Sequence, residues 1–102
     1  MIHVLAIITA HPGMRERILE AYRGNVEAVR AEEGCLAYEA AIDVDGMPSA
    51  FAAFGPDTFV VVERWASLEA LRAHGAAPHM KAYASQVQPF TASRAIHVLQ
   101  PA

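Results

Sequence analysis

The chain has 102 residues, of which 54% are hydrophobic and 19% are charged, and its formal net charge is -3. This length predicts one small domain over residues 1–102 and argues against a multidomain architecture. Because soluble domains average about 25% charged residues, the surplus of apolar side chains predicts a surface that a partner covers.

The composition excludes several classes of protein. No run of about 18 apolar residues is present, so a membrane-spanning helix is not expected. The apolar residues 4–10 follow no basic segment, and the chain has one cysteine, Cys35, with four methionines. These features predict a cytoplasmic protein without a signal peptide. Its basic residues form no stripe along the chain, so nucleic acid is not an expected partner.

The first half of the chain predicts strand, helix and strand. Residues 2–10 are rich in β-branched side chains and apolar at both parities, as in a strand covered on both faces. Residues 14–33 carry an apolar stripe with helical spacing, and Gly34 is typical of a left-handed helix cap. Residues 35–44 alternate and predict a strand with one drier face.

The segment 45–57 has no single predicted structure. It opens on the turn signal Asp45-Gly46. Phe51 and Phe54 follow, between proline and glycine residues that interrupt helices and strands. Two interpretations remain open, a hairpin extension that packs on its own chain and an apolar flap over a cleft. A connection of this length in a small domain is often functional.

The second half repeats the pattern of the first. Residues 58–65 form the strongest strand signal, with Glu63 and Trp65 on one face. Ser67 is a good N-cap for a helix, which Gly75 and Pro78 break or kink before it resumes towards Pro89. Residues 92–99 predict the closing strand.

The element order β-α-β-β-α-β predicts a ferredoxin-like α+β fold. Two right-handed crossovers joined by a hairpin give a four-stranded antiparallel sheet with both helices on one face. The strands are apolar at both parities, so the other face would expose a large apolar patch. A second copy that covers this face resolves the problem and predicts a homodimer with twofold symmetry.

Two segments resemble the antibiotic biosynthesis monooxygenase family, and its quinol monooxygenase branch most closely. They are residues 32–39 (EEGCLAYE) and residues 63–71 (ERWASLEAL), the latter followed by His74, Pro78 and His79. The resemblance extends over nearly the whole chain, with an enlargement at 45–57. It implies a dimeric α+β barrel with a ligand cleft between sheet and helices in each subunit. The family includes cofactor-free oxygenases, isomerases of phosphorylated signals and members without known substrates, so it implies fold more strongly than chemistry.

The candidate catalytic residues are His74, His79 and Glu63. A carboxylate such as Glu63 in an apolar cleft acquires a raised pKa and can act as a general base; the alternative is an ordinary ion pair with an arginine. His74 lies on the flank of its helix stripe, and the family pattern favours the cleft. A metal site is the alternative interpretation of the two histidines, but their five-residue spacing and the lack of a third ligand predict that no metal is bound.

The candidate substrate-binding residues are Trp65, Tyr83, Met80 and Phe54, which account for part of the apolar surplus. Trp65 offers an indole N–H and a flat face to an aromatic ligand, although it can equally fill the core under the second helix. Tyr83 follows His79 by one turn, and the pair can orient a hydroxyl group. No phosphate-binding, flavin or nicotinamide motif occurs, so no cofactor is expected.

Three functions follow from these residues and the resemblance. The first is a cofactor-independent monooxygenase in which a base removes a proton from an aromatic hydroquinone or polyphenol, and the resulting anion reduces O2. The second is an isomerase of a small phosphorylated metabolite, which requires Arg64 or Arg94 to point into the cleft. The third is a dimeric protein that binds an aromatic compound without turnover.

Overall fold

The computed structural model describes residues 1–102 and has the predicted order of elements. The first half contains β1 (Ile2–Ala10), α1 (Arg15–Arg30) and β2 (Cys35–Ala41). The second half contains β3 (Thr58–Trp65), α2 (Leu68–Ala76), α3 (Pro78–Val87), the short 3-10 helix η1 (Gln88–Phe90) and β4 (Thr91–Leu99). The expected ferredoxin-like α+β fold is therefore confirmed, with the second helix divided into two.

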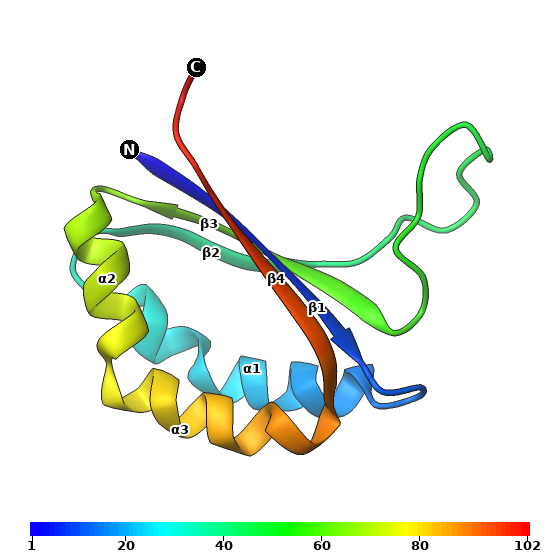
Figure 1. Ribbon diagram of the computed structural model, residues 1–102, viewed down its shortest axis with the longest axis horizontal. Helices are drawn as coiled ribbons and strands as arrows, with labels where there is room; N and C mark the ends of the chain where they lie inside the picture. The colour runs from blue at the N-terminus through cyan, green and yellow to red at the C-terminus, as the bar shows by residue number, and fades with distance from the viewer.

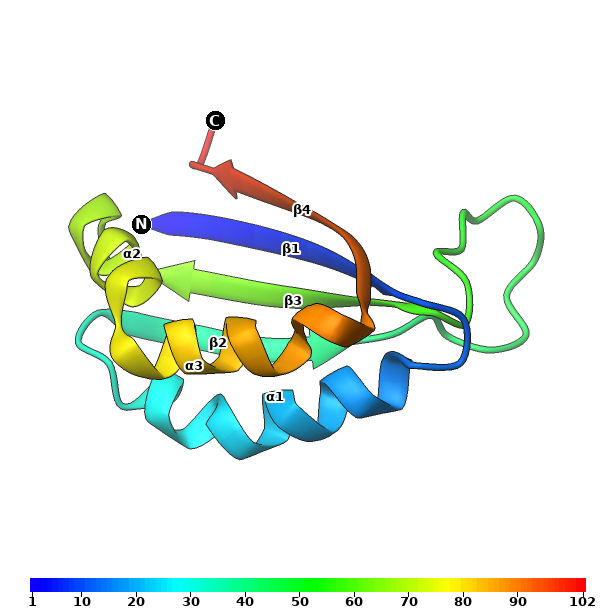
Figure 2. The ribbon, with the colours of Figure 1, turned by 60° about the horizontal axis from the view of Figure 1, so that its bottom comes forward.

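The four strands form one antiparallel sheet in the order β2-β3-β1-β4. All the helices lie on the same face of this sheet, as Figure 1 shows, and the opposite face carries no second layer. Figure 2 shows α3 running along the sheet, with α2 at one end and the start of β4 at the other. No helix is both long enough and apolar enough to cross a membrane.

The core lies between the sheet and α1. Its fully buried large side chains come from β1, β3 and α1: Trp65, Phe59, Ile18, Val4 and Val29. Alternate residues of β1 and β3 point towards the helices, so the register aligns Val4 with Glu63 and Ile2 with Trp65 on the helix side. The predicted shared face of Glu63 and Trp65 is confirmed.

Strand β2 differs from its predicted form at both ends. A bulge between Cys35 and Ala37 leaves Leu36 outside the alternation, and its side chain is 53% exposed. The strand ends at Ala41, three residues before the expected end, and Ile42 and Val44 are exposed. The predicted strand over 35–44 with a simple alternation is therefore wrong at both ends, because a bulge shifts the alternation near Leu36 and the pairing with β3 stops at Ala41.

Residues 45–57 contain no helix or strand and form a loop that projects beyond the sheet (Figure 1, green). Asp43 closes the base of this loop, because its carboxylate accepts hydrogen bonds from the backbone N–H groups of Phe54 (3.0 Å) and Gly55 (2.8 Å). These bonds also hold the pKa of Asp43 below its usual range. The loop joins the paired strands β2 and β3 without adding to their ladder, and it lies at the opposite end of the sheet from α2.

The predicted break in the second helix occurs between α2 and α3. Ala77 is extended (φ -63°, ψ 137°), as expected for the residue before a proline. Pro78 occupies the first turn of α3, where its missing N–H costs no hydrogen bond. The break places His74 in the last turn of α2 and His79 in the first turn of α3, so the two histidines lie on either side of the junction.

Candidate active site

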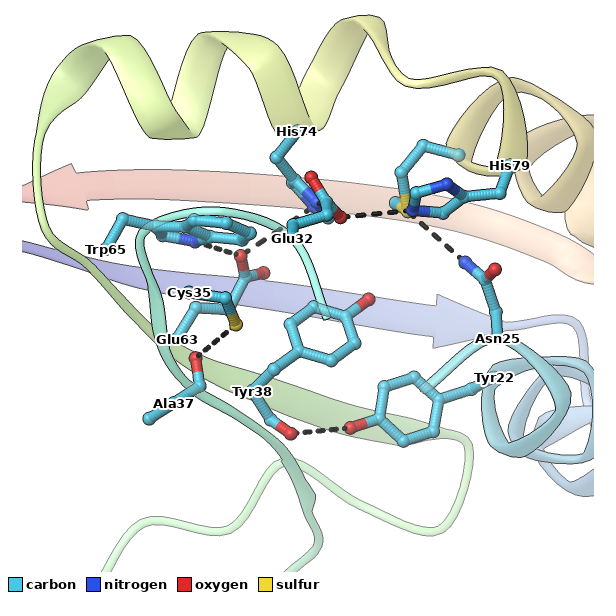
Figure 3. A network of polar contacts seen from close by, with 11 residues as sticks. Tyr22, Asn25, Glu32, Cys35, Ala37, Tyr38, Glu63, Trp65, His74 and His79 are labelled. Atoms are coloured by element: carbon cyan, nitrogen blue, oxygen red, sulfur yellow. Dashed lines mark hydrogen bonds and ion pairs between the residues drawn. The ribbon is translucent and has the colours of Figure 1, made fainter. Parts of the chain in front are cut away.

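A cluster of polar side chains lies where α1, β3, α2 and α3 meet (Figure 3). Glu32 follows the end of α1, Glu63 comes from β3, and His74 and His79 come from the two sides of the helix break. Glu32 Oε2 lies 2.8 Å from His74 Nδ1 and 3.1 Å from His79 Nε2. One carboxylate oxygen therefore joins two histidines that stand on different helices.

The helix break explains how both histidines reach the same carboxylate. On a continuous helix, residues five positions apart do not share a face. The extended Ala77 redirects the chain between His74 and His79, so their side chains converge on Glu32. The five-residue spacing that argued against a shared metal site is compatible with a shared hydrogen-bond acceptor.

His74 is held on several sides. Its side chain is 6% exposed, its ring centroid lies 4.5 Å from that of Trp65, and Tyr38 approaches it edge-on at 5.8 Å. An ionised carboxylate only accepts hydrogen bonds, so Nδ1 of His74 donates to Glu32, and in a neutral imidazole the lone pair then lies on Nε2. The Nε2 atom lies 4.0 Å from Glu63 Oε1.

Glu63 is a buried carboxyl group, 6% exposed. Burial raises its pKa; the hydrogen bond from the Trp65 indole N–H to Oε1 (2.9 Å) and the nearby His74 oppose this rise, and Glu32 adds to it. Neither of its partners is an arginine. The ordinary ion pair with an arginine considered for Glu63 is therefore absent, and its burial favours the protonated form of the carboxyl group.

A cavity of about 590 Å³ lies between the helix-facing side of the sheet and the helices α2 and α3. Of the 19 residues that line it, 12 are hydrophobic, so a ligand in it would be largely withdrawn from water. Four of the predicted site residues line this cavity: Glu63, His74, Met80 and Tyr83. Burial raises the pKa of Tyr83 to about 12, so its hydroxyl stays neutral and can donate a hydrogen bond.

The structure does not bring the other three predicted residues into the cavity wall. Trp65 is fully buried behind it, and its N–H is already donated to Glu63. His79 lines a separate groove of about 580 Å³ between α1 and α3. Phe54 is 56% exposed on the projecting loop. Trp65 thus takes the core position that was the alternative considered for it, whereas His79 and Phe54 lie outside the cavity wall.

Two residues of the site were missed by sequence reasoning. Glu32 was noted only as part of the motif at 32–39, although an acidic residue just after a helix C-terminus opposes the helix dipole and signals another role. Tyr38 pairs with Glu63 across β2 and β3 and lines the cavity. Burial raises the pKa of the Tyr38 hydroxyl, with Glu63 adding to the effect, so it too stays protonated.

The arrangement suits proton transfer at the inner end of an apolar cavity. Glu32 fixes the orientation of the His74 ring, and the carboxyl group of Glu63, whose pKa is raised by burial, stands beside it. Perturbed titratable groups in a concave site are typical of general acid and base chemistry. No group of three or more His, Cys, Asp or Glu side chains is placed to hold a metal ion.

Comparisons with known proteins give a consistent result. The family model described as antibiotic biosynthesis monooxygenase matches residues 1–86. A protein of Escherichia coli described as "Probable quinol monooxygenase YgiN" is 37% identical over 103 residues, which cover 99% of this chain and 98% of that protein. The same description and identity apply to a protein of Shigella flexneri.

Solved structures resemble this fold over almost its whole length. PA3566 from Pseudomonas aeruginosa has a TM-score of 0.82 and 26% identity, covering 99% of this chain and 93% of that one. Rv0793 from Mycobacterium tuberculosis has a TM-score of 0.81 and 27% identity, covering 99% and 94% respectively. The similarity therefore includes the strands and helices that carry the cluster around His74.

Proposed function

Because the chain belongs to the antibiotic biosynthesis monooxygenase family, we propose that it oxygenates an aromatic hydroquinone or polyphenol with O2 and without a bound cofactor. The observation that carries this proposal is His74 at the inner end of the apolar cavity, with its Nδ1 held by Glu32. The name of the Escherichia coli relative supports a quinol as the class of substrate.

His74 acts as the general base in this mechanism. A phenolic hydroxyl of the substrate hydrogen-bonds to Nε2 and gives up its proton, which leaves an electron-rich phenolate. Glu32 holds the imidazole in the required tautomer and stabilises its cation, as a positioning residue. The neutral hydroxyl groups of Tyr83 and Tyr38 can donate hydrogen bonds to the developing anion.

The phenolate then supplies electrons directly to O2. A bond forms between one oxygen atom and a ring carbon, and the O–O bond of the resulting peroxide breaks. His74 returns its proton to the departing oxygen, which leaves as water, while the ring carbon loses its hydrogen as a proton. For naphthalene-1,4-diol the products are 2-hydroxy-1,4-naphthoquinone and water. The substrate provides all four electrons that O2 accepts, so the reaction needs no bound reductant.

Oxygen uptake with naphthalene-1,4-diol tests this function. We expect uptake above the autoxidation rate with the wild-type protein, one labelled oxygen atom in the quinone product when ¹⁸O2 is used, and a loss of about 10²-fold or more in His74→Ala. His11→Ala removes an exposed histidine outside the cavity and should retain full activity. Uptake that never exceeds autoxidation across a panel of hydroquinones would refute the proposal.

A second candidate function is isomerisation of a phosphorylated metabolite, and Arg94 is the observation that favours it. Arg94 lines the cavity, whereas Arg64 lies on the opposite face of the sheet. The same base would then move a proton between carbon atoms. Under nitrogen, His74-dependent exchange of deuterium from solvent into dihydroxyacetone phosphate would favour the isomerase, and its absence together with O2-dependent turnover of the diol would favour the oxygenase.

We propose that the protein acts as a homodimer. Leu5 and Ile7 of β1 stand opposite Val62 and Val60 of β3 on the sheet face that carries no helix. Val62 is 41% exposed in the single chain. A second copy packed against this face would bury these side chains, which is the expected solution for a contiguous apolar patch.

A further inference from the structure

We propose that the ligand of the cavity is an aromatic hydroxy compound that carries a carboxylate, and that Arg94, assisted by Lys81 on the facing helix, binds this carboxylate. The inference deepens the proposed function and depends on it for the role of His74. It rests on where these two cations lie and on the absence of protein partners for them.

Arg94 belongs to the cavity side of the sheet. It pairs with Ile8 of β1, which has the same parity as the buried Val4 and Ala6. Side chains of equal parity share a face of a strand pair, so Arg94 is directed to the helix side. It lines the cavity together with Ile96 and Val98 of the same strand.

Lys81 lines the cavity from α3. It is the only lysine of the chain. Met80, Lys81, Ala84 and Gln88 form the side of α3 and η1 that lines the cavity. The cavity therefore has one cation on α3 and one on β4.

Neither cation has an anionic partner in the protein. The ion pairs of the chain involve Arg23, His74 and His79, and neither Arg94 nor Lys81 takes part in one. Among the residues that line the cavity, the only carboxyl group is Glu63, which stands at the His74 end. Both residues are exposed, and two unpaired cations on the walls of an apolar cavity can attract an anion.

The separation of the two ends indicates the shape of the ligand. Glu63 aligns with Val4, which aligns with Val98, and Arg94 lies four residues away from Val98 on β4. At about 3.3 Å per residue this places Arg94 about 13 Å along the strand from the row of Glu63. A ligand that reaches both ends must therefore be elongated, as are two fused rings with a hydroxyl group and a carboxylate at opposite ends.

The charges also fix the orientation of such a ligand. A guanidinium binds a carboxylate through two parallel hydrogen bonds, and the ammonium of Lys81 adds a point charge. At the other end, the carboxyl group of Glu63 disfavours a carboxylate substituent. The ligand therefore binds with its hydroxyl group towards His74 and its carboxylate towards Arg94.

Calorimetric titration of the intact protein with two matched probes tests this inference. The probes are 6-hydroxy-2-naphthoate, whose hydroxyl and carboxylate lie at opposite ends of the rings, and 2-naphthol, which lacks the carboxylate. We expect the naphthoate to bind about tenfold more tightly at low salt, and the preference to fall as salt screens the charges. Arg94→Gln and Lys81→Gln should each reduce the preference, and the double variant should abolish it.

Arg72→Gln is the matched control, because it removes one exposed positive charge that does not line the cavity. It should leave the preference for the naphthoate unchanged. Equal affinity for the two probes, or a preference that survives in the double variant, would overturn the inference. Tighter binding of ribose 5-phosphate than of the naphthoate would overturn it as well, in favour of a phosphorylated metabolite.

This measurement is independent of turnover, because both probes are monophenols and binding is read without oxygen consumption. Failure of the oxygenase proposal would appear as absent uptake with the wild-type protein. Failure of the carboxylate site would appear only as lost discrimination between the probes.

Discussion

The replacement of Gly34 by alanine gives the sharpest test of how the fold builds the site. Gly34 lies in the turn between α1 and β2 with a φ of +81°, which side chains other than glycine rarely adopt. A Cβ atom added there would lie 2.6 Å from the Cβ of Ala70 on α2 and 3.6 Å from the Cβ of Ala66. The first distance is too short for two carbon atoms, so either the turn or α2 must move.

The cost of Gly34→Ala has two parts. The left-handed conformation costs about 1–2 kcal/mol for a residue with a Cβ atom, and overpacking of a tight contact costs about 1–3 kcal/mol. Together they should lower the free energy of unfolding by about 2–5 kcal/mol, a large share of the about 5–15 kcal/mol that small domains possess. Glu32 lies on the displaced turn and His74 on α2, so the bond between them and the activity should weaken too.

Urea unfolding followed by the fluorescence of the single tryptophan measures this loss. Gly24→Ala is the control, because its helical position leaves open space around an added Cβ atom and the change should stabilise by about 0.5–1 kcal/mol. In a double-mutant cycle, Ala70→Gly should recover the steric part alone, giving a coupling of about 1–3 kcal/mol. A Gly34→Ala protein within about 0.5 kcal/mol of wild type, or strictly additive single changes, would refute the reasoning.

Three further predictions concern the site and the sheet. Burial raises the pKa of Glu63, so between its unfolded and folded pKa values the folded protein keeps a proton that the unfolded chain has lost, and stability falls as pH rises. Glu63→Gln should therefore raise the melting temperature more at pH 7 than at pH 4. An equal change at both pH values would contradict this. Glu32→Gln should lower kcat at least about tenfold with little change in KM, because the amide holds the His74 tautomer less well; a change confined to KM would argue for a role in binding. Val62→Lys should convert the expected homodimer to a monomer in light scattering, and a dimer that persists would place the interface elsewhere.

The local features of this fold could be predicted from the sequence because they depend on periodicity and on single punctuating residues. Alternation along 58–65 predicted that Glu63 and Trp65 share a face, and the structure confirms it. Pro78 marked the helix break correctly, whereas Gly34 has the predicted left-handed backbone but does not cap the helix, because α1 already ends at Arg30 with Ala31 as its cap. Such patterns fix which side of its own element a residue occupies, since the side-chain period of a helix or strand is constant.

The site itself was decided by tertiary structure. Glu32 meets His74 and His79 across 42 and 47 residues of chain, and only the angle between α2 and α3 brings both histidines to one oxygen. A bulge in β2, invisible in its alternating pattern, sets the parity that aligns Tyr38 with Glu63. Periodicity specifies a face but not the distance or identity of the neighbour that the face meets, because these depend on how separate elements pack. The sequence thus determined the elements and the faces of this protein, while packing decided which of its polar side chains share a cavity.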